Sequence, residues 1–201
     1  MQQTLLQEIS TYGRLLGAAF YYAPQAQEVK PILAFFERPN WIEDWHILTV
    51  SEEIQGLIRK GLSRDLDEAY QYLFIGPNAL PAPPWGSVYL DREGVIFGDS
   101  LLELRTFLKW HKITFSLDLN EPEDHFGLML MLAAYLAENH PPLLNEFLAQ
   151  HLLTWSGRYL QLLAEQTDYP FYQALSLLAQ QTLQRWQEKL MLEVPKLQLY
   201  R

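Results

Sequence analysis

The sequence predicts an all-α protein, a single globular multi-helix bundle with one long proline-rich loop. Three observations support this class. Apolar residues recur at helical spacing along most of the 201 residues. Helix-capping residues precede several of these apolar runs. Most of the helix-breaking prolines and glycines of the first half gather in one stretch, so the bundle is expected to be interrupted there only once. The predicted domain is the whole chain, residues 1–201.

The first part of the chain contains four expected helices, each with an apolar stripe at helical spacing. Their ranges are 5–20, 27–36, 50–61 and 63–74. Pro24 ends the first helix. Thr49, three residues before Glu52, has the spacing of a capping box for the third helix, and Ser63 is expected to begin the fourth.

The proline-rich segment runs from Ile75 to Gly98 and contains four prolines and four glycines. At that density no helix is expected. Val88–Leu90 and Val95–Phe97 flank the turn-like DREG and are expected to pair as a small hairpin. Two interpretations stay open for the segment: a functional loop, or a rigid strap over the core.

The remaining helices are also marked by their apolar spacing and by their first residues. Ser100 with Glu103 forms a capping box for a helix through Leu108. Pro141 begins a long helix that reaches Leu163. Residues 168–170 cap and open the last helix, and the tail after residue 194 is expected to be loose.

Residues Glu121–Ala137, EPEDHFGLMLMLAAYLA, are the stretch around which a site is expected. Asn120 with Glu123 has capping-box spacing, so Pro122, Glu123 and Asp124 are expected in the first turn of a helix, where its dipole favours negative charge. The apolar run that follows predicts a helix packed on nearly all faces. A charged helix start therefore emerges from the core.

Composition excludes several classes of function. The net charge of −9, from 15 basic and 24 acidic residues, argues against general nucleic-acid binding and favours a basic partner. The absence of cysteine excludes thiol catalysis and disulfides. The first ten residues have no export-signal pattern, and the longest apolar run falls short of the roughly 20 residues that a bilayer requires. A cytoplasmic protein without membrane insertion is expected.

Catalytic motifs do not support an enzyme. No HExxH, no phosphate-binding Gly-rich loop and no G-x-S-x-G elbow occurs. Glu121, Asp124 and His125 form the one local cluster that could serve a metal-dependent hydrolase. The alternatives are helix capping, a passive scaffold, or a groove beside Phe74, Trp85 and Tyr89 that takes a basic and apolar peptide, with Asp124 and His125 at its rim.

Two stretches together settle which alternative is favoured: YQYLFIGPNALPAPPWGSVYLDREGVIFG and EPEDHFGLMLMLAAYL. They closely resemble the signatures of the TorD/DmsD family of redox-enzyme maturation chaperones, and the similarity extends over essentially the whole chain. The resemblance implies a cytoplasmic, all-helical protein that is not an enzyme and needs no cofactor or metal. It implies binding of the twin-arginine leader of a molybdopterin-containing reductase catalytic subunit, of the dimethyl sulfoxide reductase type. The leader is kept from the Tat translocon until cofactor loading and folding are complete.

The resemblance also implies a set of peptide-binding residues. They are Tyr22, Leu73, Phe74, Pro84, Trp85, Gly98, Pro122, Asp124 and His125. In this interpretation Asp124 receives an arginine, Trp85 receives the apolar segment of the leader, and His125 orients Asp124. Tyr70 and Asn78 stand where some relatives carry tryptophan. Contacts with Tat translocon components, and a monomer or a domain-swapped dimer, remain open.

Overall fold

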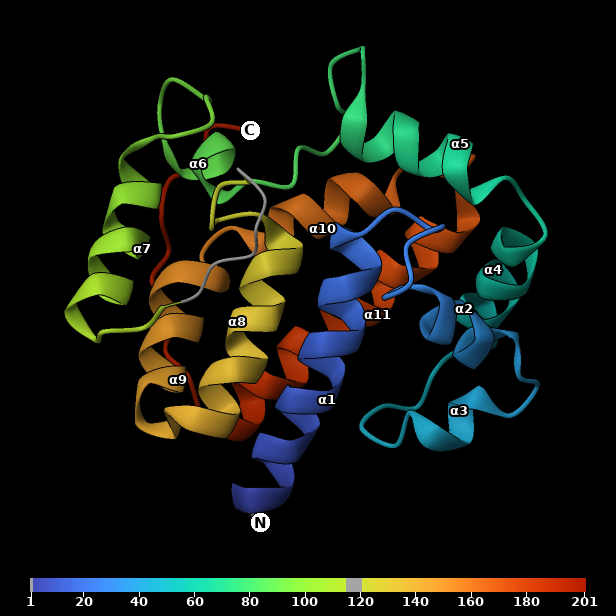
Figure 1. Cartoon of the computed structure of the whole chain (residues 1–201), viewed down its shortest axis with the longest axis horizontal. Coiled ribbons are helices and arrows are strands. Elements are labelled where there is room, and N and C mark those ends of the chain that lie inside the picture. Colours follow the sequence, from blue (N-terminus) through green and yellow to red (C-terminus); the bar gives the residue numbers. More distant parts are fainter. Residues whose placement is uncertain (1, 115–120) are drawn as a thin grey trace.

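The computed structural model describes residues 2–114 and 121–201, and within them the chain is all-helical with no strand longer than an isolated bridge. The predicted all-α class is confirmed. Two long helices lie side by side at the centre, α1 (Gln2–Tyr21) and α8 (Phe126–Asn139), as Figure 1 shows. They cross closely because both present glycine: a Cβ on Gly17 would stand 2.7 Å from the Gly127 carbonyl oxygen, and the reverse distance is also 2.7 Å.

One side of this central pair is covered by the C-terminal helices α10 (Ser156–Ala164) and α11 (Pro170–Leu190). α4 (Glu52–Leu62) packs against the start of α11, where a Cβ on Gly61 would lie 2.3 Å from the Phe171 nitrogen. α8 is buried on nearly all sides, as its unbroken apolar sequence predicts.

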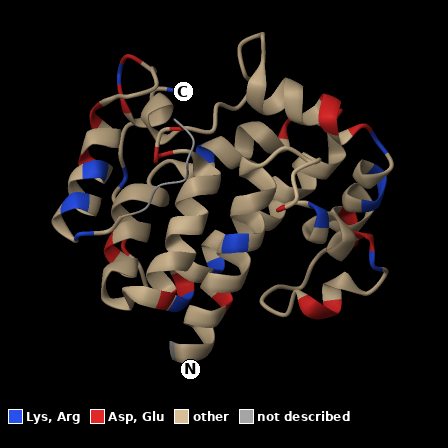
Figure 2. Cartoon of the chain, viewed as in Figure 1, with Lys and Arg blue, Asp and Glu red and all other residues tan. Residues whose placement is uncertain are grey.

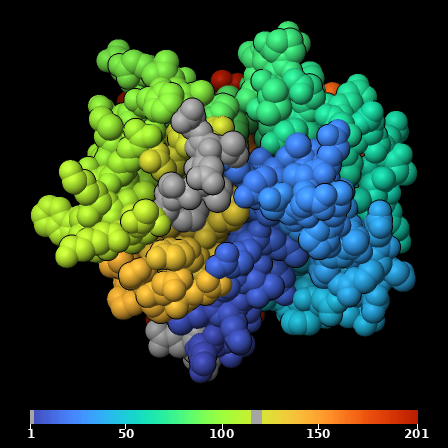
Figure 3. All heavy atoms as spheres, viewed as in Figure 1, coloured from blue at the N-terminus to red at the C-terminus, as the bar shows by residue number. Residues whose placement is uncertain are grey.

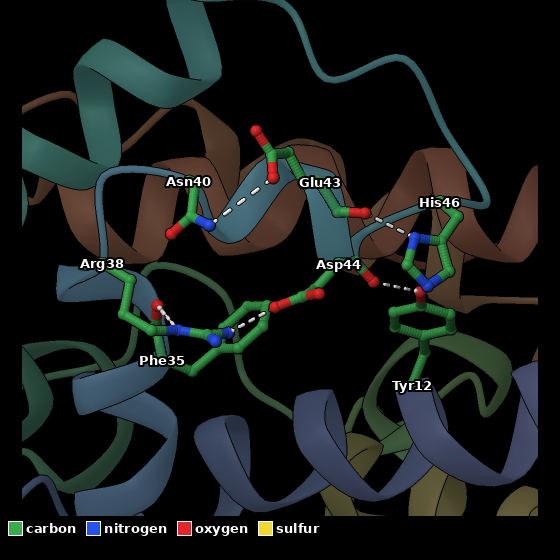
Figure 4. A network of polar contacts seen from close by, with 7 residues as sticks. All are labelled: Tyr12, Phe35, Arg38, Asn40, Glu43, Asp44 and His46. Carbon is green, nitrogen blue, oxygen red and sulfur yellow. Dashed lines mark hydrogen bonds and ion pairs between the residues drawn. The ribbon is translucent and has the colours of Figure 1, made fainter.

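The segment from α2 (Lys30–Glu37) through α3 (Trp41–Asp44) forms an aromatic corner on α1. The Tyr12 hydroxyl donates to the Asp44 carbonyl oxygen at 3.0 Å, and Arg38 pairs with the Asp44 carboxylate at 2.8 Å (Figure 4). The buried ring of Trp45 lies 4.6 Å from the Tyr12 ring. This corner is structural, because its aromatic rings are committed to the core.

α5 (Leu66–Tyr70) continues directly into the π-helical turn η1 (Gln71–Ile75). Past the proline-rich residues come α6 (Gly86–Leu90) and α7 (Asp99–Trp110), and after α8 come α9 (Pro141–Phe147) and the π-helical turn η2 (Leu148–Leu152). The long helix predicted from Pro141 is therefore broken at η2 and again before Ser156.

The hairpin predicted in the proline-rich segment is wrong. Gly86–Leu90 forms α6 directly after the last proline, so the loop without helix is shorter than predicted. The reason is positional: the prolines all precede the helix, where none of them removes an intrahelical hydrogen bond.

Several predicted caps are also wrong. Ser51 caps α4 by accepting from the Ile54 amide at 3.3 Å, in place of Thr49. Asp65 caps α5, in place of Ser63. α7 receives its cap from outside: Asp91 accepts from the Ser100 amide at 3.1 Å and from its hydroxyl at 2.6 Å. A Cβ on residue 98 would collide with this carboxylate, which explains the glycine there.

Two further expectations are decided by the same kind of contact. α8 begins at Phe126, so Pro122, Glu123 and Asp124 precede the helix and are not its first turn, while Asn120 lies outside the described residues. The tail is not loose: the Tyr200 amide donates to the Tyr89 carbonyl at 2.9 Å. No helix in the described ranges is long and apolar enough to cross a membrane.

Candidate functional site

The end of the proline-rich segment is joined to the residues in front of α8 by backbone hydrogen bonds. The Phe126 amide donates to the Pro84 carbonyl at 2.7 Å, and the Gly86 amide donates to the Asp124 carbonyl at 3.1 Å. Trp85 and His125 therefore face each other as an isolated antiparallel bridge. Because α6 and α8 begin at this bridge, two helix starts and two loops meet in one place.

Asp124 lies at the centre of this junction and is only 3% exposed. Its Oδ2 accepts from the Ser87 amide at 2.7 Å, so it caps α6 rather than α8. Its Oδ1 has no hydrogen-bond partner among the residues that the structure describes. Burial raises the pKa of Asp124, and the hydrogen bond from the Ser87 amide opposes that rise. Buried polar atoms are normally hydrogen-bonded, so this oxygen is an acceptor that could take a donor from a bound partner.

His125 caps α8, because its Nδ1 accepts from the Gly127 amide at 3.1 Å. The ring is held edge-on by Tyr21 at 5.2 Å and by Trp85 at 6.0 Å. Burial lowers its pKa to about 3, so the ring is neutral near pH 7 and does not repel a cation. The hydrogen bond goes to its own helix and not to Asp124, although the sequence interpretation has His125 orienting that carboxylate.

Glu121 and Glu123 flank the junction but have different partners. The Trp85 indole Nε1 donates to Glu121 at 2.5 Å, which fixes the ring against the loop. Burial raises the pKa of Glu121, and the indole hydrogen bond opposes the rise. Glu123 pairs with Arg105 of α7 through two contacts, at 2.8 and 2.7 Å. Glu123 therefore connects α7 to the junction and does not serve the dipole of α8.

Two tyrosines complete the junction, and the sequence interpretation assigned neither to the site. Tyr70 donates its hydroxyl to the Tyr21 carbonyl at 2.6 Å. Burial raises the pKa of both phenols to about 12, and the charge of Glu121 adds to the rise. The only sequence signal was the tyrosine at position 70 where relatives carry tryptophan, which marked that position without giving it a contact.

The structure brings some of the predicted residues together and separates others. Pro84, Trp85, Pro122, Asp124 and His125 meet at the junction. Tyr22 is adjacent through the ring of Tyr21, at 4.9 Å. The buried Leu73 and Phe74 lie in the neighbouring η1, and Gly98 lies beyond α6 against Asp91. Tyr89, predicted as a groove wall with Phe74, is fully buried and stacks on Trp155 at 5.5 Å, so it cannot receive a ligand.

A metal centre has no support from this geometry. Glu121, Asp124 and His125 direct their ligating atoms to three different donors, the Trp85 indole and the Ser87 and Gly127 amides. Within residues 2–114 and 121–201 no group of three potential ligands gathers. The hydrogen bonds of the junction connect two loops and the starts of two helices, and Oδ1 of Asp124 has no partner among the described residues.

Comparison with known proteins shows what class this arrangement belongs to. A family model described as nitrate reductase delta subunit matches residues 48–161. A Haemophilus influenzae protein, described as a probable Tat proofreading chaperone DmsD, is 56% identical over 99% of this chain and 100% of its own length. The Tat proofreading chaperone DmsD of Salmonella typhimurium is 43% identical over 96% of both chains.

A solved structure supports the fold alone. The crystal structure of a candidate redox enzyme maturation protein from Archaeoglobus fulgidus superposes with a TM-score of 0.53, covering 89% of this chain and 93% of that one at 19% identity. The class of protein is given by the sequence relatives, which are named as Tat proofreading chaperones and match over nearly the whole chain. The chain belongs to the TorD/DmsD family of redox-enzyme maturation chaperones, and the two full-length relatives given above bear the name DmsD.

Proposed function

We propose that this chaperone binds the twin-arginine signal peptide of a molybdopterin-containing reductase and holds the subunit back from Tat export until it is loaded and folded. The client is of the dimethyl sulfoxide reductase type, and the site of action is the cytoplasm, where leader and cofactor meet. The observation that carries the proposal is full-length similarity to proteins named as Tat proofreading chaperones. The free oxygen of buried Asp124 supports it.

The chemistry of a twin-arginine leader fits this junction. An arginine needs a carboxylate acceptor, and a partly shielded pair of this kind contributes about 1.5–3 kcal/mol. The neutral His125 leaves that attraction undiminished. The apolar segment of a leader needs an apolar surface, which the partly exposed ring of Trp85 offers.

The energy balance requires both parts. A micromolar Kd corresponds to about −8 kcal/mol, more than one ion pair supplies. The apolar contacts must therefore provide much of the affinity, and Asp124 must provide selectivity for arginine. The proposed peptide-binding residues are Pro84, Trp85, Pro122, Asp124 and His125 at the junction, together with Tyr22, Leu73, Phe74 and Gly98 around it.

Calorimetry with a synthetic leader peptide tests the proposal. The wild-type protein is expected to bind, and a leader with both arginines changed to lysine is expected to bind more weakly, because lysine cannot form the bidentate pair. Asp124→Asn keeps the Ser87 hydrogen bond but removes the charge, and it is expected to weaken binding about tenfold, equivalent to about 1.4 kcal/mol.

Trp85→Ala tests the apolar part of the site. Asp168→Asn, at an exposed carboxylate in front of α11, is the matched control for Asp124→Asn. Trp85→Ala should lower affinity while Asp168→Asn leaves it unchanged, with thermal unfolding confirming that each variant folds. A wild-type protein that ignores leader peptides, or binds the double-lysine peptide equally well, would rule the proposal out.

A further inference from the structure

A groove runs along α7 and reaches Asp124, and Trp85 is not among its lining residues. It consists of two adjoining pockets, of about 280 and 430 Å³, which share the side chains of Glu103 and His151 as common walls. The first pocket reaches from the start of α7 to Asp124. The second lies between α7 and the helices α9 and η2, with Trp110 at its outer end. In the space-filling view the yellow-green atoms of α7 adjoin the orange atoms of α9 at one edge of the molecule (Figure 3).

The lining of this groove is acidic. Among the described residues, five carboxylates line it and neither lysine nor arginine does: Asp91, Asp99, Glu103, Asp124 and Glu146. Figure 2 shows acidic residues at the α6–α7 loop and the start of α7, with the basic residues of α7 further along the helix. One of those, Arg105, is paired with Glu123. Burial lowers the pKa of His151, which leaves that wall uncharged near neutral pH.

The inner end of the groove contains a buried carboxylate with one oxygen that no described residue contacts by a hydrogen bond. Asp124 lines the first pocket, is 3% exposed, and leaves Oδ1 without a partner among the described residues. An orphaned buried acceptor costs free energy until a donor reaches it. A guanidinium entering the pocket would supply such donors, and the charge of the surrounding carboxylates would favour it.

The outer end adds two aromatic side chains, Phe107 and Trp110, to its polar lining. Trp110 is 80% exposed, whereas the other tryptophans are buried or partly buried. The buried Phe107 lines the same pocket. The Trp110 indole is free to pack against an aliphatic or aromatic side chain. The groove thus offers an acidic inner part and an aromatic outer part to one extended segment.

We propose that this groove, bounded by α7 and η2, binds the arginine-bearing part of the signal peptide. The inference rests on the proposed function and specifies where that peptide lies. The arginines lie along Glu103 and reach Asp124 from the α7 side, and a neighbouring apolar residue of the peptide packs on Trp110. The exposed side of the Trp85 ring then receives the remaining apolar part of the leader. In this arrangement the Asp124 side chain contacts the arginines, while the Asp124 carbonyl keeps its hydrogen bond to the Gly86 amide beside Trp85.

Charge removal without loss of shape is the first test. The double variant Glu103→Gln and Glu146→Gln is expected to weaken leader binding about five- to tenfold at low salt, because each exposed carboxylate contributes modestly. The same variant should reduce the salt dependence of Kd, since fewer charges are left to be screened. Glu52→Gln with Glu53→Gln, two exposed positions at the start of α4, is the matched control and should bind as the wild type does.

A second measurement does not depend on affinity. The chain has no cysteine, so Thr106→Cys places a single fluorophore in the wall of the outer pocket. Leader binding should change its emission, and a fluorophore at Ser63→Cys, at the end of α4, should not respond.

The outcomes separate the two proposals. A wild-type protein that binds no leader refutes the proposed function. A leader that binds the wild type and is weakened by Trp85→Ala, yet leaves the Thr106→Cys probe silent and tolerates the double glutamine variant, overturns the groove while leaving the function intact.

Discussion

Protonation of His125 is expected to destabilise the protein below neutral pH. The ring accepts a hydrogen bond from the Gly127 amide and is only 5% exposed, so a protonated ring would lose its cap and carry a buried charge. The variant His125→Asn removes the titrating group and retains a side-chain oxygen that can cap α8.

The magnitude follows from the pKa. Burial lowers the pKa of His125 from 6.5 to about 3. In the unfolded chain the ring protonates first, so its contribution to stability is complete well above pH 6.5 and is lost progressively as pH falls toward 3. Relative to about pH 7.5, the loss is about 1.4 kcal/mol at pH 5.5 and about 2.7 kcal/mol at pH 4.5.

Asp124 and Glu121 act in the opposite sense. Burial raises both of their pKa values, so their protonation favours the folded state as pH falls. The wild-type curve alone therefore mixes three contributions. The difference between wild type and His125→Asn isolates the histidine, because the two carboxyl groups are present in both proteins.

Urea unfolding followed by tryptophan fluorescence, repeated across this pH range, measures that difference. The stability gap between wild type and His125→Asn should shift in favour of the variant as pH falls. Stability curves that run parallel from neutral to acidic pH would refute the buried, neutral histidine. His125→Ala should show the same loss of pH dependence but a lower stability at every pH, because the cap is gone.

Two further predictions concern packing. Gly17→Ala should lower the free energy of unfolding by about 1–3 kcal/mol, because its methyl group would press on α8. Gly56→Ala is the control: nothing lies within 4 Å of its Cβ, so the free energy of unfolding should stay the same or rise by about 0.5–1 kcal/mol. Equal urea midpoints for the two variants would contradict the close helix crossing. The Tyr200 amide should exchange its hydrogen slowly in deuterium, because it donates to the Tyr89 carbonyl, and exchange at the rate of an unstructured chain would show that the tail is free.

Local patterns in the sequence determined the helices and their approximate order. The apolar spacing of residues 5–20 predicts α1, and the continuous apolar run after His125 predicts a helix buried on all faces. The resemblance to the TorD/DmsD family, and not the apolar spacing, marked the proline-rich segment and EPEDH as parts of one site. The helical signals are readable because helical periodicity and side-chain type act over only a few residues.

The caps and the site contacts could not be read in this way. Asp91 caps α7 from nine residues away, and Asp124 caps α6 by reaching Ser87, 37 residues back. The sequence interpretation assigned Glu123 to the dipole of α8, but it pairs with Arg105 across the junction. For α7 and for Glu123 the contact replaced a local alternative that suited the spacing, and for α6 no helix was predicted at all.

The sequence by itself determined the all-helical class and, through its resemblance to the TorD/DmsD family, the class of chaperone and the two stretches in which the recognition site is proposed. Only the tertiary structure decided that Oδ2 of Asp124 accepts the hydrogen bond from Ser87 while Oδ1 has no partner among the described residues. It also decided that an acidic groove lies along α7. The reason is physical. A helix follows from the residues within its own turns, whereas the partner of a buried polar atom depends on which distant segment the packed core brings within hydrogen-bonding distance.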